Sequence, residues 1–415
     1  MKKVYILVLI ALFCSSISRA DNPPKVLLDG EEVEIDDLPI IDGPYSTYSL
    51  RSLIIAKLLG VDYFWPVFPP LGSGEGYLEI LINIYEVFNS EEIDFIRSRL
   101  PHHTITHNSY LNLIENKSDL IITQRRISDE EKEYADEQGV TLLEKPIAVN
   151  ALAFIVNKSN PVNNLSIEQI QGIYTGDITN WNEVGGEDAT ITASVQPSDI
   201  EIGELFNSMV MDGQPASSLL ETTTNLGMSP IGSSMLPEYY FIMRNNTGLT
   251  YTSFYYCDFL FSPYATRPSK AIGVDGVAMT KDNIINGTYP YITNVYASVR
   301  SDIDKSSVAY KIYEFLTTDE GQSIVDESGY IPLPKAASIS NVSKVNANIT
   351  IRDHTINIVS EEPAQRIEVA DLQGRTMYLN TTNTNKVSLP SYMHGVYMVS
   401  VWFAGGEKIT NKVRI

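Results

Sequence analysis

Residues 144–186 read EKPIAVNALAFIVNKSNPVNNLSIEQIQGIYTGDITNWNEVGG, and they carry the strongest fold signal in the chain. The apolar run at residues 151–157 is typical of a buried strand. Ser166 follows, with Gln169 three residues later, and this capping pair predicts a helix that ends near Tyr174. A buried strand followed by a helix of this length is the building unit of α/β proteins.

The same alternation of strands and helices precedes this stretch. Strands are predicted at residues 38–43, which end in a turn, and at 119–123. Helices are predicted at residues 50–59, 77–88 and 110–115. Ser128 and Glu131 form a capping box that begins a further helix. Such alternation predicts a largely parallel sheet with helices on both faces.

The motif order in this stretch resembles the phosphate-binding receptors of ABC importers, in the periplasmic-binding-protein superfamily. The agreement runs through PIA, NPV, EQI, ITNW and EVGG, and weaker agreement extends it to about residues 38–335. The resemblance implies an α/β protein with the two-lobe, type II periplasmic-binding-protein fold at residues 36–335. It places lobe one at 36–147 and 272–335, and lobe two at 148–271. A small anionic ligand, or another small molecule, would lie in the cleft between the lobes.

The resemblance also implies three ligand-binding loops. In such a site an oxyanion is held by backbone N–H groups and hydroxyls, often with one Arg as a bidentate partner. The first two loops carry hydroxyls suited to this role, although Pro44 in the first loop has no N–H to donate. The candidate ligand-binding residues are Ser46, Thr47, Thr106, Ser109, Ser198 and, just past the strand at 119–123, Arg125.

The third loop departs from the family pattern. Gln196 aligns with the expected Arg, and residues 200–202 replace a Gly-rich helix start. Glu201 and Glu204 therefore lie near a helix N-terminus, where a carboxylate satisfies the free amides itself and repels phosphate. We expect altered or lost phosphate affinity. Arg125 and Arg126 could compensate from the cleft; the alternative is that they form a solvated or salt-bridged pair beside Glu130 and Glu131.

Other candidate sites are weaker. His103 and His107 would share a helix face, as metal ligands do, but the β-branched residues 104–106 favour a strand and no third ligand follows. We predict a flexible turn for the Gly-rich residues 72–76, which lack a following Lys. The aromatic-rich residues 239–264 could stack on sugars or a partner, but buried positions explain them better. No catalytic or cofactor motif is present, so neither enzyme activity, a metal nor a cofactor is predicted.

The charge of the chain excludes two classes of partner. Its 415 residues include 30 Lys and Arg against 51 Asp and Glu, a formal net charge of −21. Nucleic acid and anionic membranes are therefore poor partners. No apolar run reaches the roughly 20 residues that a membrane-spanning helix needs.

Both ends of the chain carry sorting features. Residues 1–20 have the basic start, short apolar run and small final residues of a secretory signal peptide, with lipidation at Cys14 as an alternative. Residues 339–415 are β-rich and predict a small all-β sandwich. The runs VADLQGR (369–375), GVYMV (395–399) and NKVRI (411–415) resemble the C-terminal sorting domain of type IX secretion substrates. This resemblance implies secretion machinery as a partner.

The two resemblances point in different directions, because an importer's receptor works in the periplasm and a type IX signal sends its carrier outside. Our leading hypothesis is a non-catalytic solute-binding protein, secreted or displayed on the surface, with altered or lost phosphate affinity. One alternative is a working periplasmic phosphate or oxyanion receptor of an ABC importer. A further alternative is a surface adhesion or assembly scaffold.

Overall fold

The computed structural model describes residues 33–334 and 348–414, apart from 69–76, 101–103, 198–199, 212, 218–220, 223–236, 261–267, 353, 361–362, 371–375, 381–383, 391–392, 394–395 and 404–407. The expected signal peptide lies outside the described residues, as do the Gly-rich residues 72–76, His102, His103 and Ser198. The chain divides into two compact units, Met1–Pro334 and Lys335–Ile415. Each is described by itself.

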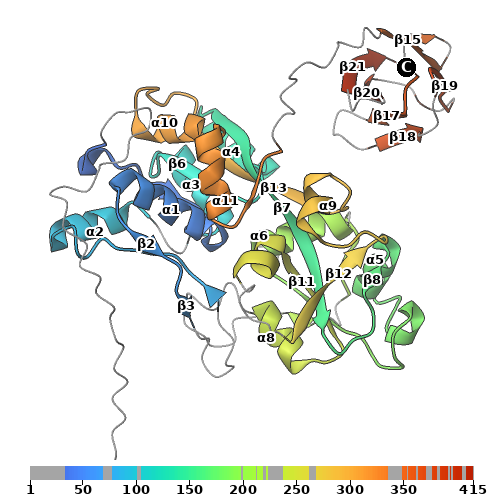
Figure 1. Ribbon diagram of the computed structural model, residues 1–415, viewed down its shortest axis with the longest axis horizontal. Coiled ribbons are helices and arrows are strands. Elements are labelled where there is room, and N and C mark those ends of the chain that lie inside the picture. The colour runs from blue at the N-terminus through green and yellow to red at the C-terminus, as the bar shows by residue number, and fades with distance from the viewer. Residues whose placement is uncertain are drawn as a thin grey trace, which may run out of the picture. The chain divides into compact units, whose positions relative to one another are not determined.

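The first unit contains a ten-stranded mixed sheet (Figure 1). Its strand order is β1-β6-β13-β7-β11-β9-β10. Strands β12 and β14 also pair with β7, and β8 pairs with β12. Its strands are β1 (Ile41–Asp42), β6 (Leu120–Thr123), β7 (Leu142–Asn157), β8 (Asn164–Leu165), β9 (Thr192–Val195), β10 (Glu221–Thr222), β11 (Gly248–Ser253), β12 (Ser269–Val274), β13 (Ile292–Arg300) and β14 (Ile331–Pro332). The prediction of a largely parallel sheet is wrong, because β7 and β13 meet all their partners antiparallel.

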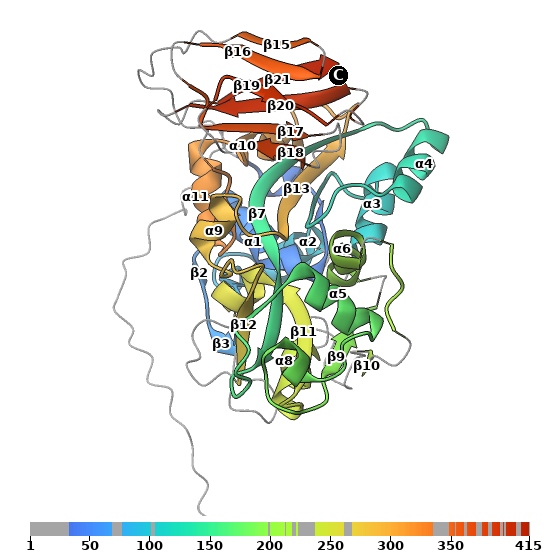
Figure 2. The same ribbon diagram turned by 90° about the vertical axis from the view of Figure 1, so that its right-hand side faces the viewer.

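Strand β7 is shared by the two halves of this sheet. Its residues up to Ala151 pair with β13, and Leu152 begins the pairing with β11. Figure 2 shows β7 running from one half to the other as a single long strand. The two-lobe α/β fold therefore has a continuous strand at its centre. The lobe boundary expected between residues 147 and 148 stays a prediction, a few residues from this change of partner.

The described helices of the first unit are α1 (Tyr48–Leu59), α2 (Ser90–Ser98), α3 (Thr106–Ile114), α4 (Asp129–Glu137), α5 (Ile167–Thr175), α6 (Glu201–Phe206), α8 (Pro237–Arg244), α9 (Lys281–Ile285), α10 (Val308–Phe315) and α11 (Asp319–Glu327). The capping boxes predicted at Ser128 and Ser166 are both confirmed, each with its reciprocal pair of hydrogen bonds. They start α4 and α5 at the predicted positions.

The helix predicted at residues 77–88 is wrong. Two short two-stranded ribbons occupy this region, one of β2 (Tyr63–Phe64) with β5 (Leu81–Ile82) and one of β3 (Val67–Phe68) with β4 (Tyr77–Leu78). Tyrosine, phenylalanine and isoleucine favour extended backbone, and a neighbouring strand with the same preference was available to pair. Tertiary pairing therefore overrides the helix-like spacing.

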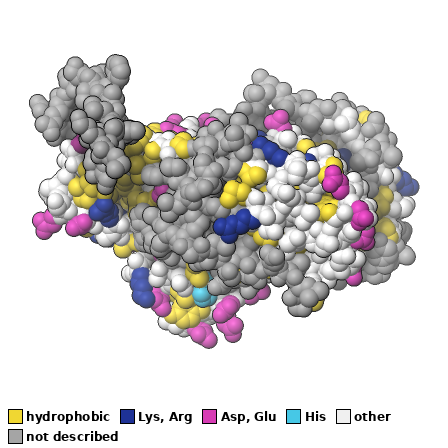
Figure 3. Space-filling view, turned by 90° about the horizontal axis from the view of Figure 1, so that it is seen from below, with side chains coloured by type: hydrophobic (Ala, Val, Ile, Leu, Met, Phe, Trp, Pro, Cys, Tyr) yellow, Lys and Arg dark blue, Asp and Glu magenta, His cyan; other side chains and the backbone are white. Residues whose placement is uncertain are grey.

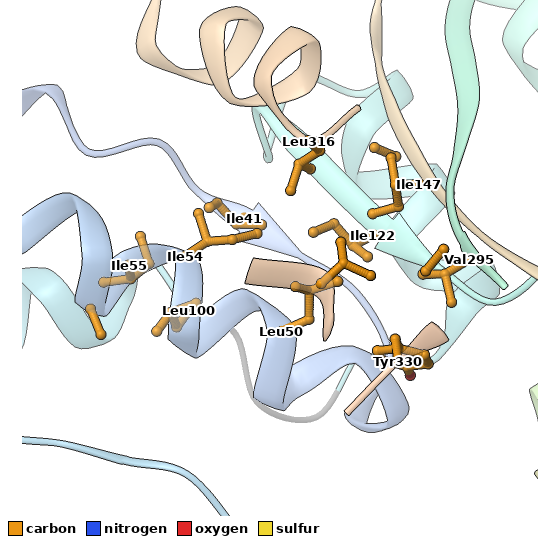
Figure 4. Packing of buried hydrophobic residues seen from close by; sticks show 14 of the residues in the cluster. Ile41, Leu50, Ile54, Ile55, Leu100, Ile122, Ile147, Val295, Leu316 and Tyr330 are labelled. Atoms are coloured by element: carbon orange, nitrogen blue, oxygen red, sulfur yellow. The ribbon is translucent and has the colours of Figure 1, made fainter. Parts of the chain in front are cut away.

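The core of the first lobe packs around α1 and β6. Figure 4 shows Leu50 and Ile54 of α1 turned toward Ile41 and Ile122, and all four side chains are buried. Arg51 is fully buried beside them and donates to the carbonyl oxygens of Ile41, Gly43 and Pro44 at 3.0, 2.8 and 3.1 Å. Burial lowers the pKa of Arg51 to about 10. This arginine fixes the loop that follows β1.

The second unit is a small all-β sandwich, as predicted. One sheet contains β15 (Asn348–Arg352), β16 (Thr355–Val359) and β19 (Lys386–Ser388); the other contains β17 (Arg366–Ala370), β18 (Thr376–Asn380), β20 (Val396–Trp402) and β21 (Lys408–Arg414). The two sheets share one apolar core, in which Ile356 and Val387 meet Ile367 and Val399.

Candidate ligand-binding site

Three loops of the first lobe present hydrogen-bond donors to one point. Ser46 lies in a short 3₁₀ helix (Tyr45–Thr47) after β1, Thr106 is the first residue of α3, and Gln124 directly follows β6. All three donate to the carboxylate of Glu201. The Ser46 hydroxyl lies 2.7 Å from Oε2, the Thr106 hydroxyl 2.9 Å from Oε1, and the Gln124 backbone nitrogen 2.7 Å from Oε1.

Glu201 is the first residue of α6, a helix that packs against β11 and β7 in the other half of the sheet. Its side chain is buried, with 8% of the residue exposed. Burial raises the pKa of the Glu201 carboxyl, although the hydrogen bonds and nearby Arg125 act in the opposite direction. We expected this carboxylate to satisfy the free amides of its own helix. That expectation is wrong, because the side chain reaches across to the loops of the first lobe instead.

Close packing positions α6 for this contact. A Cβ atom on Gly203 would lie 2.2 Å from the Pro197 carbonyl oxygen, so only glycine lets the helix approach the preceding loop this closely. At the other end of α6 the Phe206 ring stacks on Tyr251, with centroids 4.0 Å apart and planes inclined by 4°. The helix is thereby anchored to the core of the second lobe. Glu201 at its start is directed toward the loops of the first lobe.

A buried hydrogen-bond network holds the donors in place. The Gln124 side chain donates to the Tyr330 hydroxyl at 2.9 Å and accepts from the Asn150 amide at 2.9 Å. Tyr330 in turn donates to the Ser46 carbonyl at 2.7 Å. The Tyr330 ring stacks on Tyr255, with centroids 4.1 Å apart. Tyr330 thus links two of the three donor loops, and this link restricts how far the loops can move independently of Glu201.

Arg125 is not available to a ligand. Its two terminal nitrogens lie 2.8 and 2.7 Å from the two oxygens of Glu131, and its Nε pairs with Glu204 of α6. Burial acts to raise the pKa of Glu131, but the hydrogen bonds from Arg125, Ser128 and His107 and the charge of Arg125 together lower it. Burial raises the pKa of Glu204. The salt-bridge alternative of the sequence analysis describes this arginine correctly. Its neighbour Arg126 is largely exposed and pairs with Glu144.

Of the six predicted ligand-binding residues, the structure brings Ser46 and Thr106 together. Thr47 donates to the Ile122 carbonyl at 2.8 Å, and Ser109 donates to the Ile105 carbonyl at 3.2 Å, so both hydroxyls bond to backbone carbonyls of the first lobe. Ser198 lies outside the described residues. The backbone N–H of Gln124 was missed, because a main-chain donor leaves no residue type to find. Its place directly after a buried strand was the available signal.

Gln196 stands where the resemblance placed an arginine, and it faces the interior of the second lobe. Its backbone N–H donates to the Tyr251 hydroxyl at 2.8 Å, and its side-chain amide donates to Oε1 of Glu238. Within the described residues, Oε2 of Glu238 has no hydrogen-bond partner. Burial raises the pKa of Glu238 to about 8. The third loop therefore contributes no side-chain cation here.

The two weaker candidates from the sequence were the histidine pair and the aromatic-rich segment. His107 lies 3.1 Å from Glu131 Oε1, and within the residues that the structure describes no three His, Cys, Asp or Glu side chains come together as a metal would require. Tyr251, Phe254 and Tyr255 are buried in the core, as the sequence analysis favoured.

Comparison with known proteins identifies the superfamily of the chain. Residues 108–320, about half of its length, match the family described as the PBP superfamily domain. The chain belongs to the periplasmic-binding-protein superfamily. The phosphate-binding protein PstS of Bacillus subtilis is 28% identical to this superfamily member over 207 residues, which are 49% of this chain and 61% of PstS. Protein SphX of Synechococcus elongatus is 25% identical over 246 residues, 56% of this chain and 68% of SphX.

The match thus spans about three fifths of the length of PstS. Among solved structures, an ABC-type phosphate transport receptor from Vibrio cholerae aligns with this superfamily member at a TM-score of 0.44 and 23% identity, over 55% of this chain and 86% of the receptor. The resemblance stated from the sequence is confirmed.

The C-terminal resemblance is also confirmed. Residues 345–415 match the family described as the Secretion system C-terminal sorting domain. Together with the superfamily match, this indicates an exported protein. Within the described part of the chain, no helix is both long and apolar enough to cross a membrane.

Proposed function

We propose that this chain is a non-catalytic, extracytoplasmic solute-binding protein of the phosphate-receptor type whose own Glu201 occupies the oxyanion position, so that phosphate affinity is low or lost. One observation carries the proposal. The two hydroxyls and the amide that converge on Glu201 are donors of the kind that hold an oxyanion, and a carboxylate already accepts from all three.

Displacing this carboxylate is costly for phosphate. A group tethered next to its own site competes at an effective concentration of about millimolar or more, so a free ligand must bind correspondingly better. Phosphate would also meet Glu131 and Glu204, which already share the charge of Arg125. Both effects weaken phosphate binding, and neither requires any distortion of the fold.

Secretion or surface display is the second part of the proposal. The sorting-domain match supports it, with secretion machinery as the partner of residues 345–415. Asp and Glu side chains are spread over the described part of the face in Figure 3, in keeping with the net charge of −21. A protein displayed outside the periplasm has no importer to supply, which removes the need for tight phosphate capture.

The alternative is a working periplasmic phosphate receptor. The intact donors Ser46, Thr106 and Gln124 favour it, because they would be ready for an oxyanion once Glu201 withdraws. Calorimetric titration of the purified protein with phosphate near neutral pH separates the two functions. We expect no binding below millimolar phosphate, and a dissociation constant in the micromolar range or tighter would establish the alternative instead.

A further inference from the structure

The contacts of Glu201 connect the two lobes. Its carboxylate, carried by α6, accepts from three loops of the first lobe, and Arg125 of the first lobe pairs with Glu204 one turn further along the same helix. In a two-lobe binding protein a ligand bridges the lobes and holds the cleft closed. Here a side chain of the protein makes bridging contacts of that kind.

The geometry of these contacts suits a carboxylate. Oε1 accepts from Thr106 and Gln124, and Oε2 accepts from Ser46. Within the described residues, two oxygens are thus served by three donors. A phosphate would bring two further oxygens into a site where 92% of the Glu201 surface is already buried, since the residue is 8% exposed. Each buried oxygen without a donor would carry a desolvation penalty.

The charge of the surroundings suits a monoanion. Arg125 faces two carboxylates, Glu131 and Glu204, so this group alone carries a formal charge of −1 before any ligand arrives. Arg51, a buried cation of α1, faces backbone carbonyls of the first loop and lies near Asp42. A phosphate dianion would add a second negative charge where Glu201 adds one, without a free cation among these groups to balance it.

We propose, building on the function proposed above, that Glu201 is a tethered ligand that holds the two lobes closed, and that the position it fills selects a carboxylate over phosphate. A small monocarboxylate is then the class of free ligand that can take the place of Glu201.

The test measures the distance between lobes in the full chain. Fluorescent labels are attached through Asp136→Cys on α4 and Glu187→Cys in the second lobe, both exposed positions. Energy transfer is recorded for the otherwise unchanged protein, for Glu201→Ala, and for Glu238→Gln as a control. Glu238 is a second buried glutamate, whose hydrogen-bonded partner Gln196 lies in the same lobe.

We expect high transfer in the unchanged protein and in Glu238→Gln, with or without phosphate. Glu201→Ala should show lower transfer, and formate or acetate at millimolar concentration should restore it, whereas phosphate should be at least about tenfold less effective. Equal transfer in Glu201→Ala and the unchanged protein would overturn the closing role. Restoration by phosphate as readily as by formate would overturn the selectivity.

Circular dichroism checks that each variant is folded. If Glu201→Ala is unfolded, Glu201→Ser replaces it under the same criteria, because its hydroxyl is too short to reach the first-lobe loops. The outcomes are separable from those of the phosphate titration. If the unchanged protein does not bind phosphate and Glu201→Ala keeps high energy transfer, only this inference is wrong. If the unchanged protein binds phosphate tightly, the proposed function is wrong.

Discussion

The carboxylate of Glu201 lies 2.7 Å from the backbone nitrogen of Gln124, although the two residues belong to different lobes. A main-chain amide that would face a ligand in the cleft therefore faces a side chain of the protein itself. The buried network of Gln124, Tyr330 and Asn150 keeps that amide directed at the cleft. The three donors therefore contact the Glu201 carboxylate in this structure.

Removal of the Thr106 hydroxyl should weaken the contact between the lobes. Thr106→Val keeps the shape of the side chain and deletes one hydrogen bond to a charged group, worth about 1.5–3 kcal/mol. We expect a loss of that size in the free energy of unfolding, measured by urea denaturation. Ser109→Ala is the matched control, because its hydroxyl serves only a carbonyl on its own helix. An equal loss in both variants would count against a special role for Thr106.

Arg125→Lys should destabilise the protein without changing its response to phosphate. Lysine cannot reproduce the two-pronged contact with Glu131 together with the pairing to Glu204, and we expect a cost of about 1–3 kcal/mol. Arg126→Lys should cost less than Arg125→Lys, because the Arg126 side chain is 68% exposed where it pairs with Glu144. Denaturation compares the two variants. If Arg125→Lys instead altered phosphate affinity, Arg125 would be a ligand residue after all.

Gly203→Ala should displace α6. The added Cβ would lie 2.2 Å from the Pro197 carbonyl oxygen, and because that oxygen is backbone, the helix itself must move. Overpacking of this kind costs about 1–3 kcal/mol. The variant should therefore unfold at lower urea and show lower energy transfer between the labelled lobes. Unchanged transfer would mean that Glu201 reaches its donors without help from this packing.

Glu238 should make stability depend on pH. Its pKa is about 8 in the folded protein and 4.5 in the unfolded chain, so the folded state holds the proton more tightly. The contribution of Glu238 to the free energy of unfolding is then greatest below about pH 4.5. It is lost as the pH rises toward 8, by on the order of 3–5 kcal/mol. Glu238→Gln should remove that dependence. Urea denaturation at pH 5 and pH 8.5 measures it, and parallel losses in the two proteins would contradict the assignment.

The sorting domain makes a prediction about location. Mass spectrometry of the culture medium, the cell surface and the periplasm should find the protein outside the periplasm, because residues 345–415 match a secretion sorting domain. A chain that lacks residues 339–415 serves as the control and should be retained. Detection of the protein with an intact C-terminus in the periplasm alone would refute secretion.

Local sequence signals predicted much of this fold. The capping boxes at Ser128 and Ser166 act within four residues and were recognisable without the tertiary structure. The helix predicted at residues 77–88 was wrong because the strands that pair with this segment, β2 and β3, lie earlier in the chain. At the site, Glu201 was recognised as an obstacle to phosphate, but the sequence could not show that its side chain crosses to Ser46, 155 positions away.

We propose that the Glu201 carboxylate occupies the position of a bound oxyanion, and hydrogen exchange at Gln124 tests this occupancy. The exchange rate of this amide is followed by mass spectrometry in phosphate-free buffer, for the unchanged protein and for Glu201→Ala. We predict strong protection in the unchanged protein and a clear loss of protection in the variant. Equal exchange rates in the two proteins would contradict the claim, because the amide would then have no bond to Glu201 to lose.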